Sequence, residues 1–259
     1  MTTHSSFRSG RSKNAWWMVN HEFQSALETL GLNQQDTLER WIDYGQEATR
    51  ATTGRGRTQL LALPDREEKL ILRRTLHGGV LGPLWRGYIG SFKRIQRELE
   101  VTSSLQQAGA AVPCPALGIA IASGPLWRAS MATVYIPGTV TALDFLSQAQ
   151  VEAKRMHPVA SAVGETLGYF HGCGGRHADL HAGNILVRED EEQARAWVID
   201  LDKAEFDGSR GARRPAELKR LAHSLEKRNR LASVNHEIRS CFRNAYETGL
   251  EAGLGQMSR

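Results

Sequence analysis

Two short polar segments on either side of a predicted β-hairpin limit most strongly what this chain can fold into. The first, HADLHAGN (177–184), brings together two histidines, an aspartate and an asparagine, and the second is VIDLD (198–202). NILV (184–187), which begins at the end of the first segment, and AWVID (196–200), which runs into the second, have the composition of strands. The charged REDEEQAR (188–195) that separates them has the composition of a turn. A hairpin of this kind returns Asp200 to the neighbourhood of Asn184.

The residue types in these segments are those that phosphoryl transfer from ATP requires. The reaction needs a carboxylate to orient the acceptor hydroxyl and hard oxygen ligands to hold Mg²⁺ between the phosphates. Asp179 offers the carboxylate, and Asn184 and Asp200 offer an amide oxygen and a second carboxylate. The alternative is a surface turn followed by an ordinary strand end. The order and spacing of both segments across one hairpin favour a catalytic loop.

The chain before these segments is rich in predicted strands. We predict, in order, an unordered start (1–12), two short amphipathic helices broken near Gly31 (21–44), a hairpin turning at Pro64 and Asp65 (58–73), a helix (92–109) and a strand–turn–strand unit (111–138).

After Pro137 and Gly138 the pattern becomes mainly helical and ends in the basic helical stretch PAELKRLAHSLEKRNRLASV. We therefore predict an α+β fold of two lobes. Residues 1–136 form an N-terminal extension and a small β-rich N-lobe with one inserted helix, which serves as the nucleotide lid. Residues 137–259 form a larger, mainly helical C-lobe with the catalytic loop, the metal site and the acceptor-binding surface.

Composition narrows the class of protein further. The 259 residues are 41% hydrophobic and 24% charged, as in ordinary globular proteins. Three cysteines without a CxxC pair argue against a zinc site or a disulfide framework and favour a reducing compartment. The formal net charge of +5 suits a partner that carries phosphate. No apolar run is long enough to span a bilayer, so any membrane association is expected to be peripheral.

HADLHAGN resembles the catalytic loop H-x-D-L-x-x-x-N of the protein-kinase-like superfamily, and VIDLD resembles the strand that ends in the metal-binding Asp of D-F-G. The resemblance implies that Asp179 is the catalytic base, that Asn184 and Asp200 bind Mg²⁺, and that His177 braces the loop. His181 stands where protein kinases often have a Lys near the transferred phosphate. A His is common there in small-molecule kinases, so the acceptor need not be a protein.

The same resemblance implies that the N-terminal part binds ATP. A short glycine element before the first strand of the hairpin would cover the phosphates, although taken alone it is more typical of a tight turn. The segment before Pro137 would be the hinge against which adenine packs. The residues assigned to these two contacts are Gly54, Arg55, Gly56, Val134 and Tyr135.

The place of the ATP-holding Lys is taken by Arg73, which departs from most kinases because Arg is not an equivalent of Lys. Its partner on the inserted helix would be Glu98, which we prefer, or Glu100. Lys69 is the alternative cation, although it lies at the start of its strand. The pairing follows the kinase template, and a solvated helix face is the simpler alternative.

Within the superfamily the chain resembles the bacterial lipopolysaccharide-core kinases, in particular the 3-deoxy-D-manno-octulosonic acid (Kdo) kinases. The segments that carry this resemblance are LRRTLHGGVLGPL, RELEVTSSLQQAGAAVPCP, VIDLDKAEF and LKRLAHSLEK. It implies transfer of the ATP γ-phosphate to the 4-OH of Kdo on a Kdo-lipid A precursor. The protein would then work at the cytoplasmic face of the bacterial inner membrane, or in the cytoplasm, with no nucleic acid and no obligate protein partner.

An anionic glycolipid acceptor suits the basic stretches, because an anionic leaflet attracts Lys and Arg. The residues proposed for that peripheral contact are Arg86, Lys93, Arg94, Arg213, Arg214, Lys219, Arg220, Lys227 and Arg228. A charge run on a helix is otherwise an ordinary solvated face. The competing functions are a heptose kinase or other small-molecule phosphotransferase of the superfamily, and a pseudokinase-like or nucleic-acid-binding module.

Overall fold

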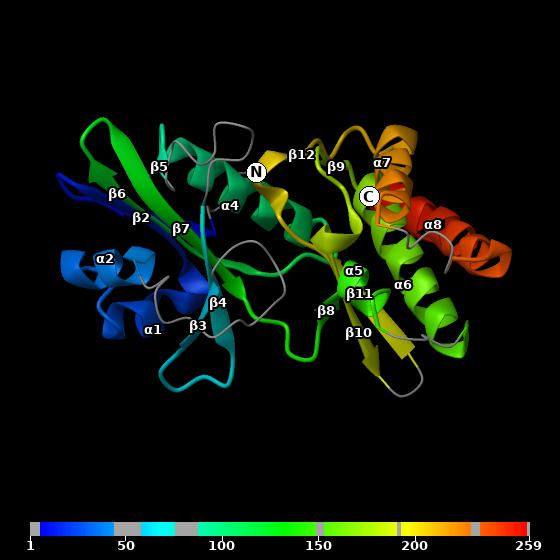
Figure 1. The fold of residues 1–259 in the computed structure, drawn as a ribbon. Helices are drawn as coiled ribbons and strands as arrows, with labels where there is room; N and C mark the ends of the chain where they lie inside the picture. The colour runs from blue at the N-terminus through cyan, green and yellow to red at the C-terminus, as the bar shows by residue number, and fades with distance from the viewer. Residues whose placement is uncertain are drawn as a thin grey trace. The chain divides into compact units, whose positions relative to one another are not determined.

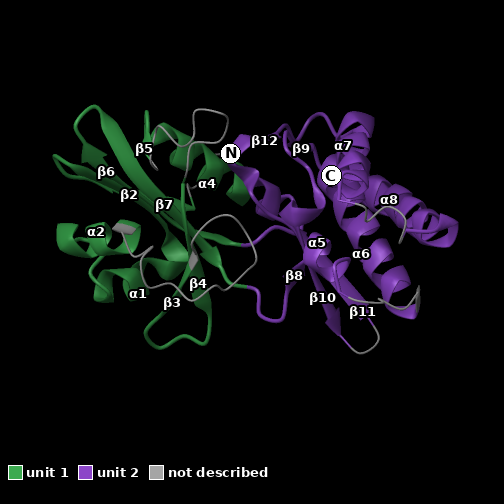
Figure 2. Ribbon diagram, in the orientation of Figure 1, with its two compact units in different colours: residues 1–103, 114–135 green, residues 104–113, 136–259 purple. Residues whose placement is uncertain are grey.

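The computed structural model describes residues 6–43, 58–75, 88–148, 153–190, 193–228 and 234–257. It divides the chain into two compact units (Figure 2). Unit 1 comprises Met1–Ser103 and Cys114–Tyr135, and unit 2 comprises Ser104–Pro113 and Ile136–Arg259.

Residues 104–113 belong to unit 2, although we had assigned them to the N-terminal part. Two hydrogen bonds tie this segment to unit 2: Tyr169 Oη donates to Ala108 O at 3.0 Å, and Val198 N–H donates to Ala111 O at 2.9 Å. The chain therefore enters unit 2 once before returning to the sheet of unit 1.

An antiparallel sheet of seven described strands forms the centre of unit 1, in the spatial order β1-β2-β6-β7-β4-β3, with β5 beside β7 (Figure 1). The strands are β1 (Phe7–Arg11), β2 (Ala15–Asn20), β3 (Thr58–Ala62), β4 (Lys69–Arg74), β5 (Tyr88–Ile89), β6 (Pro115–Ser123) and β7 (Leu126–Val134). The β3–β4 and β6–β7 hairpins match the prediction, and Asp65 takes the left-handed turn conformation (φ 57°).

The prediction of an unordered start was wrong for β1. Its register with β2 runs from Phe7 opposite Asn20 to Arg11 opposite Trp16. Phe7 is buried, and a Cβ at Gly10 would lie 2.2 Å from the ring of Trp17, so the glycine makes room for that indole. The polar sequence FRSGR does not have the apolar alternation from which a strand is predicted. The strand is stable because it pairs with β2 and contacts the aromatic residues of β2.

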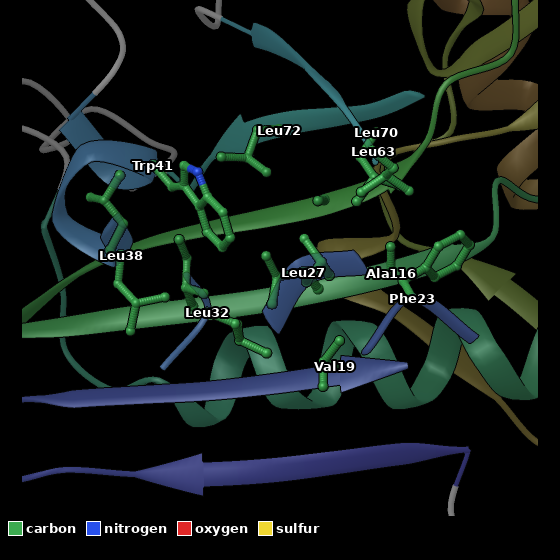
Figure 3. Packing of buried hydrophobic residues seen from close by; sticks show 14 of the residues in the cluster. Val19, Phe23, Leu27, Leu32, Leu38, Trp41, Leu63, Leu70, Leu72 and Ala116 are labelled. Atoms are coloured by element: carbon green, nitrogen blue, oxygen red, sulfur yellow. The ribbon is translucent and has the colours of Figure 1, made fainter. Parts of the chain in front are cut away.

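Helices cover both faces of this sheet. On one face lie α1 (Gln24–Thr29) and α2 (Gln35–Asp43). Leu27 of α1 and Trp41 of α2 share one buried core with Phe23, which precedes α1, and with Leu70 and Leu72 of the sheet (Figure 3). The break between these helices is at Gly31, as predicted, with φ 96°.

The helix α4 (Lys93–Gln107) covers the other face and is the predicted inserted helix. Its Ile95 and Leu99 pack with Trp16, Met18 and Met131 of the sheet. Leu70 and Leu72 belong to the opposite core, so the intervening positions of β4 alternate toward the α4 face. This alternation places Arg73 on the same side of the sheet as α4.

Unit 2 combines two small sheets with helices (Figure 1). One sheet has the order β11-β10-β8, and the other pairs β12 with β9. The elements are β8 (Val140–Thr141), α5 (Ala142–Phe145), α6 (Ala153–Gly172), β9 (Gly175–His177), β10 (Ile185–Asp190), β11 (Gln193–Val198), β12 (Ala204–Phe206), α7 (Pro215–Glu226) and α8 (His236–Met257).

The hairpin that joins the two polar segments is longer than predicted. Its strands continue to Asp190 and restart at Gln193, so most of the expected turn 188–195 is paired strand. Charged side chains fit there because this end of the hairpin is solvated, and Arg188 pairs with Asp190 at 3.3 Å. At the other end, Asn184 belongs to a 3-10 turn rather than to the strand.

The helices α6 and α8 pack with their backbones in close contact. Glycines repeat every fourth residue on α6, and α8 carries a similar pair that includes Gly249. A Cβ at Gly168 would lie 2.0 Å from Tyr246 O, and one at Gly249 would lie 2.2 Å from Glu165 O. Glycine lowers helix propensity by about 1 kcal/mol. The glycines of α8 dilute its apolar pattern, which is why this helix was not predicted.

Candidate active site

The loop between β9 and β10 carries Asp179, His181 and Asn184, and His177 holds it in place. The imidazole of His177 is buried, with 1% of the residue exposed. Its Nε2–H donates to Ile199 O at 3.0 Å, and its Nδ1 accepts the N–H of Asp179 at 3.2 Å. Because Nδ1 accepts a hydrogen bond, the ring proton lies on Nε2, and a neutral imidazole satisfies both contacts. His177 thus joins the loop to the residue before Asp200, which is the predicted bracing contact.

Asn184 connects the end of the loop to the same return strand. Its Nδ2 donates to Asp179 O at 2.9 Å, and its backbone O accepts the N–H of Ile199 at 3.0 Å. Since the amide nitrogen is committed to the loop backbone, the side-chain oxygen is the atom that can ligate a cation. The structure therefore places Asn184 beside the segment that carries Asp200.

Asp200 has an unusual backbone conformation. It lies in the left-handed region (φ 62°, ψ 59°) and precedes the 3-10 turn Leu201–Lys203. Among the described residues, Asp65 and Asp200 are the non-glycine residues with positive φ. Aspartate reaches this region more readily than most residues, and strained backbone concentrates at functional sites. The conformation turns the chain sharply after β11, at the point where the predicted metal ligand lies.

His181 is half-buried at the start of the 3-10 turn, and its Nδ1 accepts the N–H of Gly183 at 3.1 Å. Burial is the largest influence on its pKa and lowers it, and the positive charge of Arg228 lowers it further. The carboxylates of Asp179 and Asp200 act in the opposite direction but do not offset the burial. At neutral pH the ring is therefore uncharged and has its proton on Nε2. It can donate a hydrogen bond to phosphate, but it lacks the charge of the Lys found in protein kinases.

The donor set fits Mg²⁺ better than a softer metal. Within the described ranges, no group of three or more His, Cys, Asp or Glu side chains could hold a metal ion. Mg²⁺ does not need such a group, because it commonly takes one or two carboxylates and completes its shell with phosphate oxygens and water. The side-chain oxygens of Asn184 and Asp200 are compatible with that arrangement, and their role as ligands stays a prediction.

In unit 1, Arg73 on β4 forms a hydrogen-bonded ion pair with Glu98 on α4. The side chain of Glu98 is 2% exposed and that of Arg73 is 35% exposed, so the guanidinium extends from a buried carboxylate toward solvent. Glu100, the other possible partner, is exposed and accepts from Gln96 Nε2 at 2.9 Å. Lys69 is exposed at the start of β4. The predicted pairing is present, while the role of Arg73 in ATP binding stays a prediction.

The other residues assigned to the nucleotide are less fully described. Gly54, Arg55 and Gly56 lie outside the described residues. Val134 is the last residue of β7, and Tyr135 follows it immediately before the division between the two units. Their N–H groups are used within unit 1, donating to Cys114 O at 2.9 Å and to Lys69 O at 2.8 Å, respectively. The adenine contact there stays a prediction.

Two residues of α7 contact the loop and were not predicted to do so. Glu217 accepts the backbone N–H of His177 at 2.8 Å, and Arg220 Nη1 donates to His177 O at 3.3 Å. We had assigned Arg220 to a membrane surface, and it serves at least in part to hold the loop. Glu217 was missed because a Glu among the charged residues of an amphipathic helix is typical of a solvated face.

Other members of the predicted basic surface also have partners within unit 2. Arg213 forms a bidentate ion pair with Glu247 at 2.5 and 2.6 Å, and Arg214 Nη2 donates to Arg210 O at 3.0 Å. Arg86 lies outside the described residues. In the part of the chain that the structure describes, no helix has both the length and the apolar character needed to cross a membrane.

We expect Arg73→Met to raise the KM for ATP by about tenfold or more, since a charge-assisted hydrogen bond to phosphate contributes about 1.5–3 kcal/mol. The same change deprives the buried carboxylate of Glu98 of its Arg73 contact and should lower the free energy of unfolding by about 1–3 kcal/mol. The double variant Arg73→Met/Glu98→Gln separates the two effects. It should regain stability in urea unfolding while its KM for ATP stays high, and recovery of the KM would contradict a phosphate contact.

Both the structure and the sequence of this chain are similar to those of known proteins. The chain is similar to a solved structure of "WaaP in complex with acyl carrier protein", with a TM-score of 0.54 over 93% of this chain and 96% of that chain. At 17% identity, the likeness concerns the fold alone. Residues 39–242 match the "Lipopolysaccharide kinase (Kdo/WaaP) family", which covers most of the chain. The chain belongs to this family, and a family of kinases uses ATP as the phosphate donor.

Curated relatives agree with this assignment. The chain is 29% identical over 192 residues to a "3-deoxy-D-manno-octulosonic acid kinase" of Vibrio parahaemolyticus, covering 71% of this chain and 76% of the relative. It is 27% identical over 211 residues to a protein of the same name from Vibrio cholerae, covering 79% and 84%.

Proposed function

We propose that the protein transfers the γ-phosphate of ATP to the 4-hydroxyl of Kdo on a Kdo-lipid A precursor. The observation that carries the proposal is the loop geometry. His177 ties the backbone of Asp179 to Ile199, and Asn184 bonds the same loop beside Asp200. Two Vibrio relatives named "3-deoxy-D-manno-octulosonic acid kinase" match most of the chain and support the choice of acceptor. The two units would then be the lobes of a protein-kinase-like fold.

In this proposal Asp179 orients the acceptor hydroxyl and accepts its proton as the oxygen bonds to the γ-phosphorus. The bond from that phosphorus to the bridging oxygen breaks, and ADP leaves. His181 donates its Nε2–H to the transferred phosphate. Asn184 and Asp200 would hold Mg²⁺, which supplies charge neutralisation between the phosphates.

The remaining assignments follow the same scheme. Arg73, oriented by Glu98, would bind an ATP phosphate oxygen, and Gly54, Arg55 and Gly56 would cover the phosphates. Val134 and Tyr135 would pack against adenine. These contacts position the donor, which is the main contribution that a protein makes to phosphoryl transfer.

We further propose that the acceptor lipid is reached by peripheral contact with the inner membrane. Exposed basic residues that can serve this contact are Lys93, Lys219, Lys227 and Arg228. Each such residue near an anionic surface contributes roughly 1 kcal/mol, which salt weakens. Flotation with phosphatidylglycerol vesicles at low and high salt would test this part of the proposal. Binding that is equally strong to neutral vesicles would contradict it.

The acceptor assay decides the function. Purified protein is incubated with Mg²⁺, γ-labelled ATP and, in parallel, Kdo-lipid A precursor, a heptosylated core and soluble sugars. We expect label in the Kdo-lipid, at the 4-position when the product is analysed by NMR. Transfer to the heptosylated core alone would identify a heptose kinase instead, and transfer to a soluble sugar alone would identify another small-molecule phosphotransferase.

A further inference from the structure

We propose that Arg228, an exposed residue just after helix α7, binds the carboxylate of the acceptor sugar and makes the protein specific for a sugar acid. Helix α7 ends at Glu226, and the backbone N–H of Arg228 donates to Leu225 O at 3.2 Å, so a helical turn continues to this residue. The inference rests on the proposed function, because it concerns a group that the acceptor carries beside its reacting hydroxyl.

One side of α7 lies along the loop that carries the proposed base. Arg220 Nη1 donates to His177 O at 3.3 Å, and one turn later Ser224 Oγ accepts the N–H of Ala182 at 3.4 Å. Residues four apart lie on the same side of a helix, because one turn holds 3.6 residues. Arg228 follows Ser224 at this spacing. Its place in the turn therefore puts it on the side of α7 that faces the loop.

The electrostatics of the loop agree with this placement. Burial is the main cause that lowers the pKa of His181, and the positive charge of Arg228 lowers it further. Because water and salt screen charges over about 10 Å, this effect indicates that the two residues are close. Arg228 is exposed, and within the described ranges no hydrogen bond or ion pair engages its guanidinium. The structure thus leaves this guanidinium available to a ligand beside the loop.

The chemistry of the proposed acceptor requires a cation at such a place. Kdo carries a carboxylate on its anomeric carbon, two ring positions from the carbon that bears the 4-hydroxyl. When that hydroxyl lies at Asp179, the carboxylate is held close to the same loop. Arginine suits it, because the planar guanidinium binds a carboxylate with two parallel hydrogen bonds. A heptose has no carboxylate, so Arg228 would favour Kdo over a neutral sugar.

Removing the guanidinium should weaken acceptor binding and spare the chemical step. We expect Arg228→Met to raise the KM for Kdo-lipid A precursor in neutral detergent micelles by about ten- to a hundredfold. The kcat and the KM for ATP should change less than about threefold, because the contact holds substrate and transition state alike. Arg228→Lys keeps the charge without the planar fork and should fall in between. Neutral micelles exclude any contribution of Arg228 to attraction by an anionic membrane.

A neutral form of the acceptor identifies what Arg228 binds. In this form the carboxylate of Kdo is converted to an amide, and the rest of the lipid is unchanged. Wild-type protein should use the amide with a kcat/KM about ten- to a hundredfold lower than that for the acid. Arg228→Met should use both forms equally within about threefold, because the contact is already lost. If Arg228 binds a phosphate of ATP or of the lipid instead, its replacement will cost the same on both forms, and the proposal is wrong.

Arg243→Met is the matched control. Arg243 is an exposed arginine of α8, and among the described contacts no hydrogen bond or ion pair joins it to the loop. The substitution removes the same charge from the same unit and should leave the KM for the acceptor within about twofold. If it raises this KM as much as Arg228→Met does, general attraction between charges explains both results and refutes a specific contact.

Direct binding separates this inference from the proposed function. Calorimetry with a non-hydrolysable ATP analogue and acceptor micelles needs no phosphate transfer. Wild-type protein should bind the acid at least about tenfold more tightly than the amide, and Arg228→Met should bind both alike. If wild-type protein shows this preference but transfers no phosphate to Kdo-lipid, the proposed function fails and the acid site stands. Transfer to Kdo-lipid without a preference for the acid refutes the acid site alone, and the absence of both refutes both.

Discussion

Asp179→Asn is expected to lower the rate of phosphate transfer from ATP by about 10²- to 10⁴-fold, the usual contribution of a general base. The contacts that shape the loop at this position use backbone atoms: Asp179 N–H bonds to His177 and Asp179 O bonds to Asn184. An asparagine therefore keeps the loop geometry and removes only the carboxylate. Transfer of labelled phosphate under single-turnover conditions measures the loss, and circular dichroism confirms that the variant is folded.

Nucleotide binding distinguishes Asp179 from Asp200. Because Asp179 is not assigned to the metal, its Asn variant should bind Mg²⁺-ATP with nearly wild-type affinity in calorimetry. Asp200→Asn should instead weaken Mg²⁺-ATP binding while affecting metal-free ATP much less, since it removes a carboxylate ligand. Full activity in Asp179→Asn would refute the assignment of the base, and equal effects of both variants on Mg²⁺-ATP would refute the division of roles.

Gly168→Ala is expected to lower the free energy of unfolding by about 2 kcal/mol or more, which is typical of overpacking against an immobile neighbour. The new Cβ would lie 2.0 Å from Tyr246 O and 2.8 Å from Leu250 N, both backbone atoms of α8. The two helices must therefore separate, since no side chain can rotate away. Urea unfolding followed by circular dichroism measures the change.

Gly255→Ala provides the matched control for this prediction. Gly255 lies on the same helix α8, and a Cβ there would meet nothing within 4 Å. The substitution should raise the free energy of unfolding by up to about 1 kcal/mol through helix propensity alone. If Gly168→Ala is also stabilising, the close approach of α6 and α8 is wrong.

Local pattern was sufficient for much of the fold. The β3–β4 and β6–β7 hairpins, the break at Gly31 and the helix α4 all follow from alternation, turn residues and 3.6-residue periodicity. For these features, neighbours in sequence carry the information. The pairing of Arg73 with Glu98 was also predicted, but from the resemblance to the kinase template and not from local pattern.

The failures of prediction share a different cause. β1 is a strand because β2 offers it an edge, and α8 is a stable helix because the glycines of α6 allow its backbone to approach. The sequence of β1 does not indicate its pairing with β2, and the sequence of α8 does not indicate its packing against α6. The charged end of the β10–β11 hairpin was assigned to a turn for the same reason: solvent exposure of paired strands cannot be read from charge alone.

The sequence by itself carries the residues of the proposed chemistry, Asp179, Asn184 and Asp200, in the order that the kinase resemblance assigns to phosphoryl transfer. Only the tertiary structure decided how the loop that carries Asp179 is held. Glu217 lies forty residues after His177 and reaches its N–H because α7 packs beneath the loop, with His171 and Tyr246 behind it. Hydrogen bonds between distant segments depend on packing in three dimensions, and no local periodicity encodes them.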